Sequence, residues 1–246
     1  MVMDRTIAGA GTSEEAWRLE ARLDSVRHCQ AAQLLPPEAR VVLCAPHPDD
    51  EILPCAGALR ERGEGPLTIL AITNGEMSHP RYRDVLREAR PRETLASIEA
   101  LGIVAEIERL GFPDGGLEAR LPALTQSIAE HLCPGDHLIS PWGLDGHPDH
   151  EATYHAAAAA AKLAGAAPPI EVPIWGWHWC SPGRNPFPWS RAVKVPLSFE
   201  SRERKQRAIA QFSTQISPLD GEAPILSEQT LRRFYRPWEL FFSFQY

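Results

Sequence analysis

Two short segments of the sequence place histidine and aspartate at a spacing that suits metal binding. In HPDDE, His47 and Asp50 stand three residues apart. In HPDHE, His147 and His150 repeat that spacing. Residues three apart in a turn that opens into a helix can face the same point. Imidazole and carboxylate are ordinary zinc donors, and a catalytic zinc has three protein ligands and one position left open for water. We therefore predict that the two segments are halves of one metal site.

Other polar residues in these segments have the right chemistry to act beside a metal. Asp49 adjoins the predicted ligands, and its carboxylate can accept a proton from water whose pKa the ion lowers to about 7. Asp149 is placed to orient a ligating histidine. Whichever of His147 and His150 is not a ligand can stabilise an oxyanion or protonate a departing amine. Spacing alone leaves open which of these two histidines binds the metal.

A chance origin for the two segments is the less favoured interpretation. A single H-x-x-D spacing in a loop usually arises by chance. Here, however, two such segments each follow an apolar run, RVVLCA and HLISPW. Burying His47, Asp49 and Asp50 together without a cation would cost several kcal/mol in desolvation and repulsion. The pattern therefore favours a metal site.

Apolar runs alternate with helical patterns from residue 39 onward, and this alternation predicts how the segments are positioned. It predicts an α/β fold, a Rossmann-like and mostly parallel sheet with helices on both faces. In such folds, ligands bind beyond the carboxyl ends of the strands, where both segments lie. Strands are expected at 40–45, 67–75, 104–111, 137–142, 170–179 and 192–198, and helices near 51–62, 83–101, 119–132, 148–164 and 199–214.

We expect one α/β domain over residues 37–246, preceded by an N-terminal helical extension over residues 1–36. In the extension, apolar residues recur at roughly helical intervals, namely Trp17, Leu19, Leu23 and Val26. The stretch GAGTSE resembles a dinucleotide-binding fingerprint, but no strand precedes it and its third glycine is missing, so that interpretation is rejected.

Three tryptophans alternate near the end of the predicted strand 170–179. On a strand, Trp175, Trp177 and Trp179 would share one face, and we expect them to pack in the core rather than to stack on a sugar. His178 would then point to the other face, and we predict that it lies at the rim of the site.

Composition excludes several classes of partner. The net charge of -7 argues against binding to nucleic acid or to an anionic membrane. No apolar run approaches the ~20 residues that span a bilayer, and the polar start lacks a signal-peptide core.

The five cysteines form no C-x-x-C pair, which favours reduced thiols. We therefore expect a cytoplasmic protein. An oligomer is possible, because the extension and the aromatic C-terminus could pack between subunits.

The combination of PHPDDE and HPDH resembles the signature of the PIG-L/LmbE-like zinc-dependent N-deacetylases, which act on N-acetylglucosamine-bearing substrates. The resemblance extends from about residue 39 to residue 213 and includes TNGE, LGFPDGG, the pair Arg90 and Glu93, and a K-x-x-A-x-x-x-F pattern that begins at Lys205. Pro46 and Asn74 replace the alanine and the aspartate that are usual there, and neither carries the chemistry.

The resemblance implies a role for each residue of the two segments. It makes His47, Asp50 and His150 the ligands of Zn²⁺. It makes Asp49 the general base that activates water at the zinc and later serves as the acid. It makes His147 the residue that stabilises the tetrahedral intermediate. This assignment would settle which histidine of the second segment binds the metal.

The resemblance also implies the substrate and its contacts. The family's substrate-binding arginine and aspartate fall on Arg90 and Asp114. The expected reaction removes an N-acetyl or similar N-acyl group from a small amino sugar or glycoconjugate. The alternatives are another metal-dependent hydrolase, such as a phosphoesterase or a non-sugar amidase, and a non-catalytic metal- or carbohydrate-binding module. Two-metal phosphoryl transfer usually needs more bridging carboxylates, and a structural zinc would leave Asp49 without a role.

Overall fold

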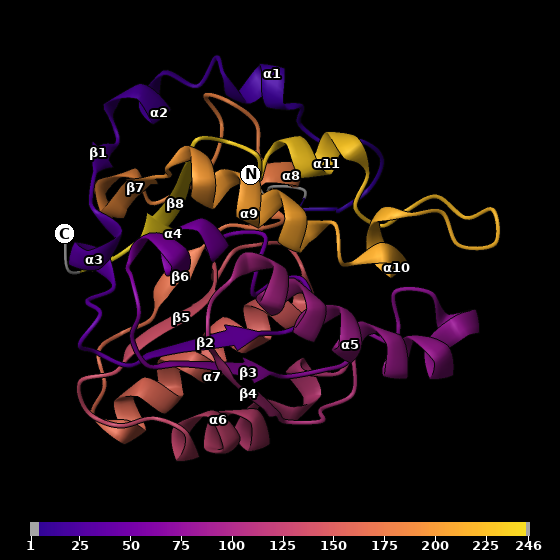
Figure 1. The fold of residues 1–246 in the computed structure, drawn as a ribbon, viewed down its shortest axis with the longest axis horizontal. Coiled ribbons are helices and arrows are strands. Elements are labelled where there is room, and N and C mark those ends of the chain that lie inside the picture. The colour runs from indigo at the N-terminus through magenta and orange to yellow at the C-terminus, as the bar shows by residue number, and fades with distance from the viewer. Residues whose placement is uncertain (1–4, 245–246) are drawn as a thin grey trace.

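An eight-stranded sheet forms the centre of the structure, a computed structural model that describes residues 5–244 (Figure 1). From one edge to the other, the strands are β1 (Arg27–His28), β7 (Ala192–Pro196), β8 (Trp238–Phe242), β6 (Ile170–Val172), β5 (His137–Pro141), β2 (Val41–Ala45), β3 (Leu67–Ala71) and β4 (Glu106–Arg109). Among these strands, β8 runs antiparallel to its neighbours β6 and β7, and the other pairs are parallel. The predicted mostly parallel α/β fold is confirmed.

Helices cover both faces of this sheet. In β2, Val41 and Leu43 belong to one apolar core, whereas Val42 and Cys44 belong to a second core on the opposite face. This alternation follows from the two-residue period of a strand. The first core includes residues of α4 (Ala56–Glu61), α5 (Arg83–Leu101) and α9 (Phe199–Ile209), and the second includes residues of α6 (Leu121–Glu130) and α7 (Pro148–Ala164). The shorter elements are α1 (Glu14–Trp17), α2 (Ala21–Ser25), α3 (Ala31–Leu34), α8 (Gly176–Trp179), α10 (Ser213–Ile216), α11 (Glu228–Arg232) and the 3-10 helices η1 (Pro80–Tyr82), η2 (Glu118–Arg120) and η3 (Trp189–Arg191).

The segment that follows β6 corrects one prediction. The expected strand 170–179 ends at Val172, and the tryptophans that follow it enter the short helix α8. The chain turns here because the carboxylate of Asp145 accepts hydrogen bonds from the backbone amides of residues 174, 175 and 176. Trp177 is buried in the core, whereas Trp175 is only partly buried. The three indoles therefore do not share the face of a strand.

The N-terminal segment packs closely against the rest of the molecule. The expected helix is two short helices, α1 and α2. Trp17 is fully buried, its indole donates a hydrogen bond to the carbonyl of Trp177, and its ring stacks on Phe187 with centroids 5.6 Å apart. Strand β1 adds to the edge of the sheet by pairing with β7. Residues 1–4 of the expected extension and residues 245–246 of the expected domain lie outside the described residues.

Strand β8 links the chain's last described segment to the helix that follows HPDDE. Its residue Glu239 is buried and accepts hydrogen bonds from the backbone amides of Gly57 and Ala58 in the first turn of α4. The ammonium group of Lys205 in α9 lies 2.7 Å from the same carboxylate. An added Cβ at Gly57 would lie 2.5 Å from a Leu197 methyl group and 3.1 Å from Glu239 Oε1, so glycine leaves room for both side chains.

Among residues 5–244, the structure has no helix of sufficient length and apolar character to cross a bilayer.

Replacing Lys205 by methionine should destabilise the fold strongly. The substitution keeps the length of the side chain but leaves the buried Glu239 carboxylate without its cation. We expect the free energy of unfolding to fall by about 3–5 kcal/mol, measured by urea denaturation. Lys162→Met is the matched control, because Lys162 is an exposed lysine in α7, and it should change stability by less than about 0.5 kcal/mol. Equal stability of the two variants would contradict the role given to this ion pair.

Candidate metal centre

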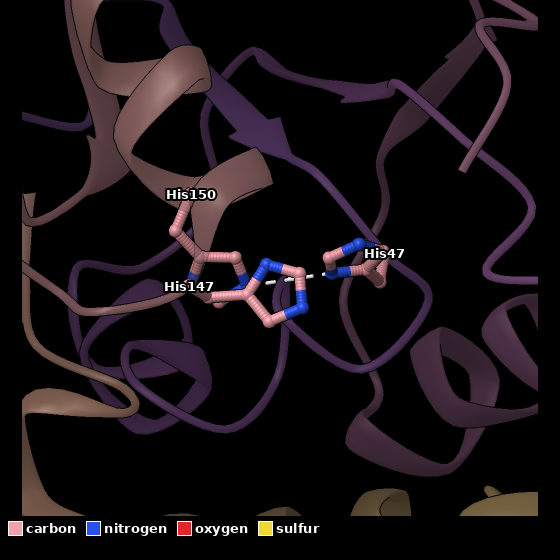
Figure 2. A group of neighbouring side chains, drawn as sticks. All are labelled: His47, His147 and His150. Atoms are coloured by element: carbon pink, nitrogen blue, oxygen red, sulfur yellow. Dashed lines mark hydrogen bonds between the residues drawn. The ribbon is translucent and has the colours of Figure 1, made fainter. Parts of the chain in front are cut away.

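The two histidine–aspartate segments meet because the strands that precede them are neighbours. Strands β2 and β5 pair in parallel, so their carboxyl ends lie at the same edge of the sheet. His47 follows the end of β2, His147 is the N-cap of α7, and His150 lies in the first turn of that helix. Figure 2 shows the three imidazoles pointing toward one another. The structure thus brings together residues 100 positions apart, as the sequence predicts.

Three donor atoms form a triangle at this meeting point. The Asp50 Oδ2 atom lies 3.2 Å from Nδ1 of His47 and 3.2 Å from Nε2 of His150. The two imidazole nitrogens are 3.3 Å apart. Tetrahedral zinc bonds of about 2.05 Å imply donor separations of about 3.3 Å, which these distances match.

Each histidine of the triangle has a carboxylate at its other ring nitrogen. Nδ1 of His150 lies 2.8 Å from Asp145 Oδ2. Nε2 of His47 lies 3.2 Å from Asp114 Oδ1 and 3.4 Å from Asp149 Oδ2. When these outer nitrogens carry the proton, the inner nitrogens present lone pairs to each other and to Asp50, an arrangement that a cation stabilises.

The surrounding carboxylates make the centre strongly negative. Burial opposes a charge on His150, but Asp50 and Asp145 outweigh that effect and raise its pKa to about 9. The pKa of His47 is also raised, because Asp114, Asp149 and Asp50 together outweigh its desolvation. The buried carboxylates therefore favour positive charge here, from protons or from a metal ion. This preference and the donor geometry both fit a divalent ion.

Asp49 stands beside the triangle in a strained backbone conformation. Its φ of +117° lies outside the region that residues other than glycine normally adopt. Its backbone amide donates to Glu51 Oε2 at 2.9 Å, which holds the turn. Burial raises the pKa of the Asp49 carboxyl well above its ordinary value, although the nearby Arg90 opposes that shift. A carboxylate with raised proton affinity is suited to accept a proton.

Arg90 positions this aspartate. The buried guanidinium donates to the carbonyl oxygens of Pro48 at 2.5 Å and Gly75 at 2.6 Å, and its Nη2 lies 3.2 Å from Asp49 Oδ2. The arginine therefore connects the loop after β2 with the loop after β3. Arg90 also lines the cavity beside the triangle. Its position is compatible both with holding Asp49 and with the predicted contact to a substrate.

His147 is neutral and presents a proton toward the cavity. Its Nδ1 accepts a hydrogen bond from the backbone amide of Asp149 at 3.2 Å, which leaves the proton on Nε2. Burial and the neighbouring His150 and His47 lower its pKa to about 3. The His147 ring lies 4.8 Å from the rings of His47 and of His150, centroid to centroid, and the three imidazoles form a group that could hold a metal ion.

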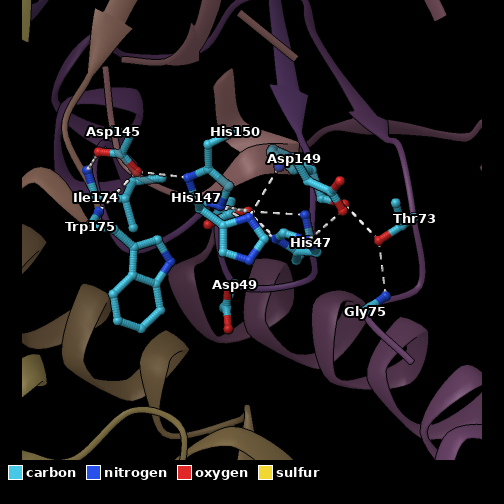
Figure 3. Close-up of polar contacts among 12 residues, drawn as sticks. His47, Asp49, Thr73, Gly75, Asp145, His147, Asp149, His150, Ile174 and Trp175 are labelled. Atoms are coloured by element: carbon cyan, nitrogen blue, oxygen red, sulfur yellow. Dashed lines mark hydrogen bonds and ion pairs between the residues drawn. The ribbon is translucent and has the colours of Figure 1, made fainter. Parts of the chain in front are cut away.

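A cavity of about 390 Å³ opens in front of these groups, and we call it the reaction cavity. Figure 3 shows Asp49, the imidazole of His147 and the indole of Trp175 around it. Its polar lining comprises the predicted site residues His47, Asp49, Asp50, Arg90, Asp114 and His147 together with Ser78 and Gln215.

One predicted residue, His178, lies away from the triangle, and one residue that was not predicted, Asp145, contacts it. His178 does not reach the triangle, since its ring nitrogens lie 3.1 Å from the carbonyl of Ala8 and 3.2 Å from Nη1 of Arg233. Its role as a substrate contact stays a prediction. Asp145 was not predicted, although it stands in the same run, DGHPDHE. Its four hydrogen-bond partners include amides from beyond β6, and local spacing could not show that contact.

Replacing Asp145 by asparagine should weaken zinc binding. The amide NH₂ would donate to Nδ1 of His150, so the ring proton would move to Nε2 and remove the lone pair that faces Asp50. We expect the zinc affinity to fall about 10–100-fold, measured by competition with a chromogenic chelator. Asp84→Asn, a change at an exposed residue of α5, is the control and should bind zinc like the native chain. Unchanged affinity in Asp145→Asn would rule out this orienting role.

Comparison with known proteins agrees with the fold and with the motifs. Residues 42–161 match the family model described as PIG-L: GlcNAc-PI de-N-acetylase. A probable N-acetyl-alpha-D-glucosaminyl L-malate deacetylase 2 of Bacillus anthracis is 33% identical over 135 residues, which are 50% of this chain and 59% of that protein. The chain thus spans less than two thirds of the length of this relative.

Solved structures share the same architecture. A conserved protein of Thermus thermophilus is 27% identical, with a TM-score of 0.53 over 82% of this chain and 93% of that one. The deacetylase of the antimicrobial A40926 pseudoaglycone is 20% identical, with a TM-score of 0.56 over 84% and 96%. The N,N'-diacetylchitobiose deacetylase of Pyrococcus horikoshii is 18% identical, with a TM-score of 0.51 over 85% and 82%. At their low identity, the last two support the fold alone.

The family match covers β2, β5, most of α7 and both histidine–aspartate segments, which together build the triangle of donor atoms. The chain is therefore similar to the PIG-L family over the residues that form this site.

Proposed function

We propose that this chain is a zinc-dependent N-deacetylase that removes an acetyl or similar acyl group from the nitrogen of an amino sugar or its conjugate. The observation that carries the proposal is the triangle of His47 Nδ1, Asp50 Oδ2 and His150 Nε2, with separations of 3.2–3.3 Å and the carboxylate of Asp49 beside it. The family match and the curated relative support the substrate class.

In this proposal, His47, Asp50 and His150 hold the zinc ion. A bound zinc supplies Lewis acidity, which lowers the pKa of water and polarises a carbonyl oxygen. Asp114, Asp145 and Asp149 keep the outer ring nitrogens of the two histidines protonated, so that the inner nitrogens remain donors.

Asp49 acts as the general base and then as the general acid. It takes a proton from the water that attacks the amide carbonyl, and it delivers that proton to the nitrogen as the C–N bond breaks. The products are a free amine and the carboxylate of the acyl group. Arg90 fixes the position of Asp49 and limits how far burial raises the pKa of its carboxyl.

His147 stabilises the negative charge that develops on the carbonyl oxygen. Its neutral imidazole offers Nε2–H, and the backbone amide of Asp149 fixes the ring by donating to Nδ1. A preorganised donor of this kind costs no reorganisation when the charge forms. Arg90 and Asp114 also line the reaction cavity, and we propose them as contacts of the sugar.

We place this reaction in the cytoplasm as part of the proposal. The five cysteines, all among residues 5–244, form no disulfide, and four of them are buried. A chain whose thiols are all free is compatible with a reducing compartment.

Substitutions at the two adjacent aspartates should separate catalysis from metal binding. Asp49→Asn should keep about one zinc per chain and lower kcat by about 10²–10⁴-fold, because the proton acceptor is lost. Asp50→Ala should lose the metal, because one donor of the triangle is missing. Metal content by mass spectrometry and acetate release from N-acetylated amino sugars measure both effects. Near-native kcat in Asp49→Asn, or full zinc content in Asp50→Ala, would contradict these roles.

Removing the metal should abolish activity reversibly. Dialysis against a chelator should stop acetate release from the native chain, and adding Zn²⁺ should restore it, because both imidazoles and Asp50 are available to rebind the ion. Magnesium is the control and should not restore activity, since it prefers oxygen ligands. Full activity after chelation would overturn the metal-dependent mechanism.

A further inference from the structure

A second cavity continues the reaction cavity away from the metal centre. It has a volume of about 850 Å³, and we call it the outer cavity. Ile7, Trp175 and Ile225 line both cavities, so the two spaces adjoin across these apolar side chains. The reaction cavity alone accommodates a sugar ring, and the outer cavity extends the space available to whatever that sugar carries.

The walls of the outer cavity come from the two ends of the chain. Residues 7–15 form one side, residues 223–232 form the other, and Trp175 and His178 complete the lining. Arg233 joins these segments by donating to the carbonyl oxygens of Ala10 at 2.6 Å and Thr12 at 2.8 Å. His178 holds residues 7–15, which we call the N-terminal strap. Its carbonyl accepts a hydrogen bond from the amide of Thr12, and its ring contacts the carbonyl of Ala8. The wall of the cavity is therefore held by hydrogen bonds to two buried residues, Arg233 and His178.

The charged residues that line the outer cavity argue against an anionic ligand group there. Two arginines stand among the lining residues of the two cavities, and carboxylates engage both of them. Arg90 contacts Asp49, and Arg232 lies 2.9 Å from Glu228 and 3.4 Å from Glu15. The outer cavity therefore has a net negative rim. A phosphate or carboxylate on the substrate would meet one cation among the lining residues of the outer cavity, Arg232, and would compete for it with Glu15 and Glu228.

We propose that the substrate is an amino-sugar conjugate whose non-sugar part is uncharged and apolar, and that this part lies in the outer cavity against Ile7, Trp175 and Ile225. This inference rests on the proposed function for the sugar, and it adds the chemical class of the group attached to that sugar. The apolar side chains favour binding by burial of surface, and the acidic rim disfavours anionic conjugates.

Three matched N-acetylglucosaminides test this proposal on the zinc-loaded chain. They carry a methyl, a 4-nitrophenyl or a 4-carboxyphenyl group, and the last two have nearly the same shape but differ in charge. We expect kcat/KM for acetate release from the 4-nitrophenyl compound to exceed that from each of the other two by about 10-fold. Calorimetric binding of the same compounds should give the same order of affinity.

Variants at Ile225 test the location. Its side chain is 38% exposed, so substitutions there should not prevent folding. Ile225→Ser should reduce the preference for 4-nitrophenyl over methyl, and Ile225→Lys should shift the preference toward the 4-carboxyphenyl compound. Val104→Ser is the control, because Val104 is 91% exposed and lies away from both cavities, and it should change neither ratio.

The outcomes separate this inference from the proposed function. Acetate release without preference among the three compounds, or with preference for the anionic one, would overturn the inference and leave the deacetylase proposal standing. Selective binding of the 4-nitrophenyl compound without acetate release would overturn the deacetylase proposal and support the apolar subsite. Neither binding nor release would overturn both.

Discussion

The concentration of buried negative charge at the ends of β2 and β5 is the constraint on which the site depends. Asp50 faces both His47 and His150, and further carboxylates stand at the far side of each ring. Such an arrangement is unfavourable without positive charge, because burial disfavours each carboxylate and the carboxylates repel one another. A divalent ion at the inner face of the rings would satisfy this requirement, and the same field would hold the imidazoles in the tautomers that bind it.

The rest of the fold serves to hold these groups in place. Asp145 couples His150 to the turn after β6, so the conformation that directs the chain into α8 also fixes a predicted ligand. Arg90 links the loops after β2 and β3 and thereby supports the strained backbone of Asp49. Glu239 accepts hydrogen bonds from two backbone amides in the first turn of α4, the helix that follows HPDDE. Each contact joins segments far apart in sequence, which explains why the site needs the whole sheet.

The parts that the sequence predicts well are those governed by local patterns. Helices 83–101 and 148–164 occur at the predicted bounds, because their apolar periodicity is long. The convergence of the two segments followed from parallel topology, since neighbouring strands expose their carboxyl ends at one edge. The resemblance to a family supplied the distinction between His147 and His150, and spacing alone did not.

The parts that were missed depend on long-range contacts. Three backbone amides donate to Asp145 and convert the end of the predicted strand 170–179 into a turn and α8, which local propensity does not reveal. Strand β8 enters the sheet from a tail that matches no motif, and its partners β6 and β7 lie more than forty residues earlier. The outer cavity arises only where the N-terminal strap meets residues 223–232, so neither segment alone indicates it.

Anomalous diffraction from crystals of the zinc-loaded chain, recorded on both sides of the zinc absorption edge, would locate the metal ion and its ligands. We expect one zinc peak per chain, bonded to Nδ1 of His47, a carboxylate oxygen of Asp50 and Nε2 of His150, with the carboxylate of Asp49 near it but not bonded to it. A zinc peak elsewhere, or ordered side chains at these positions with no zinc between them, would contradict this assignment.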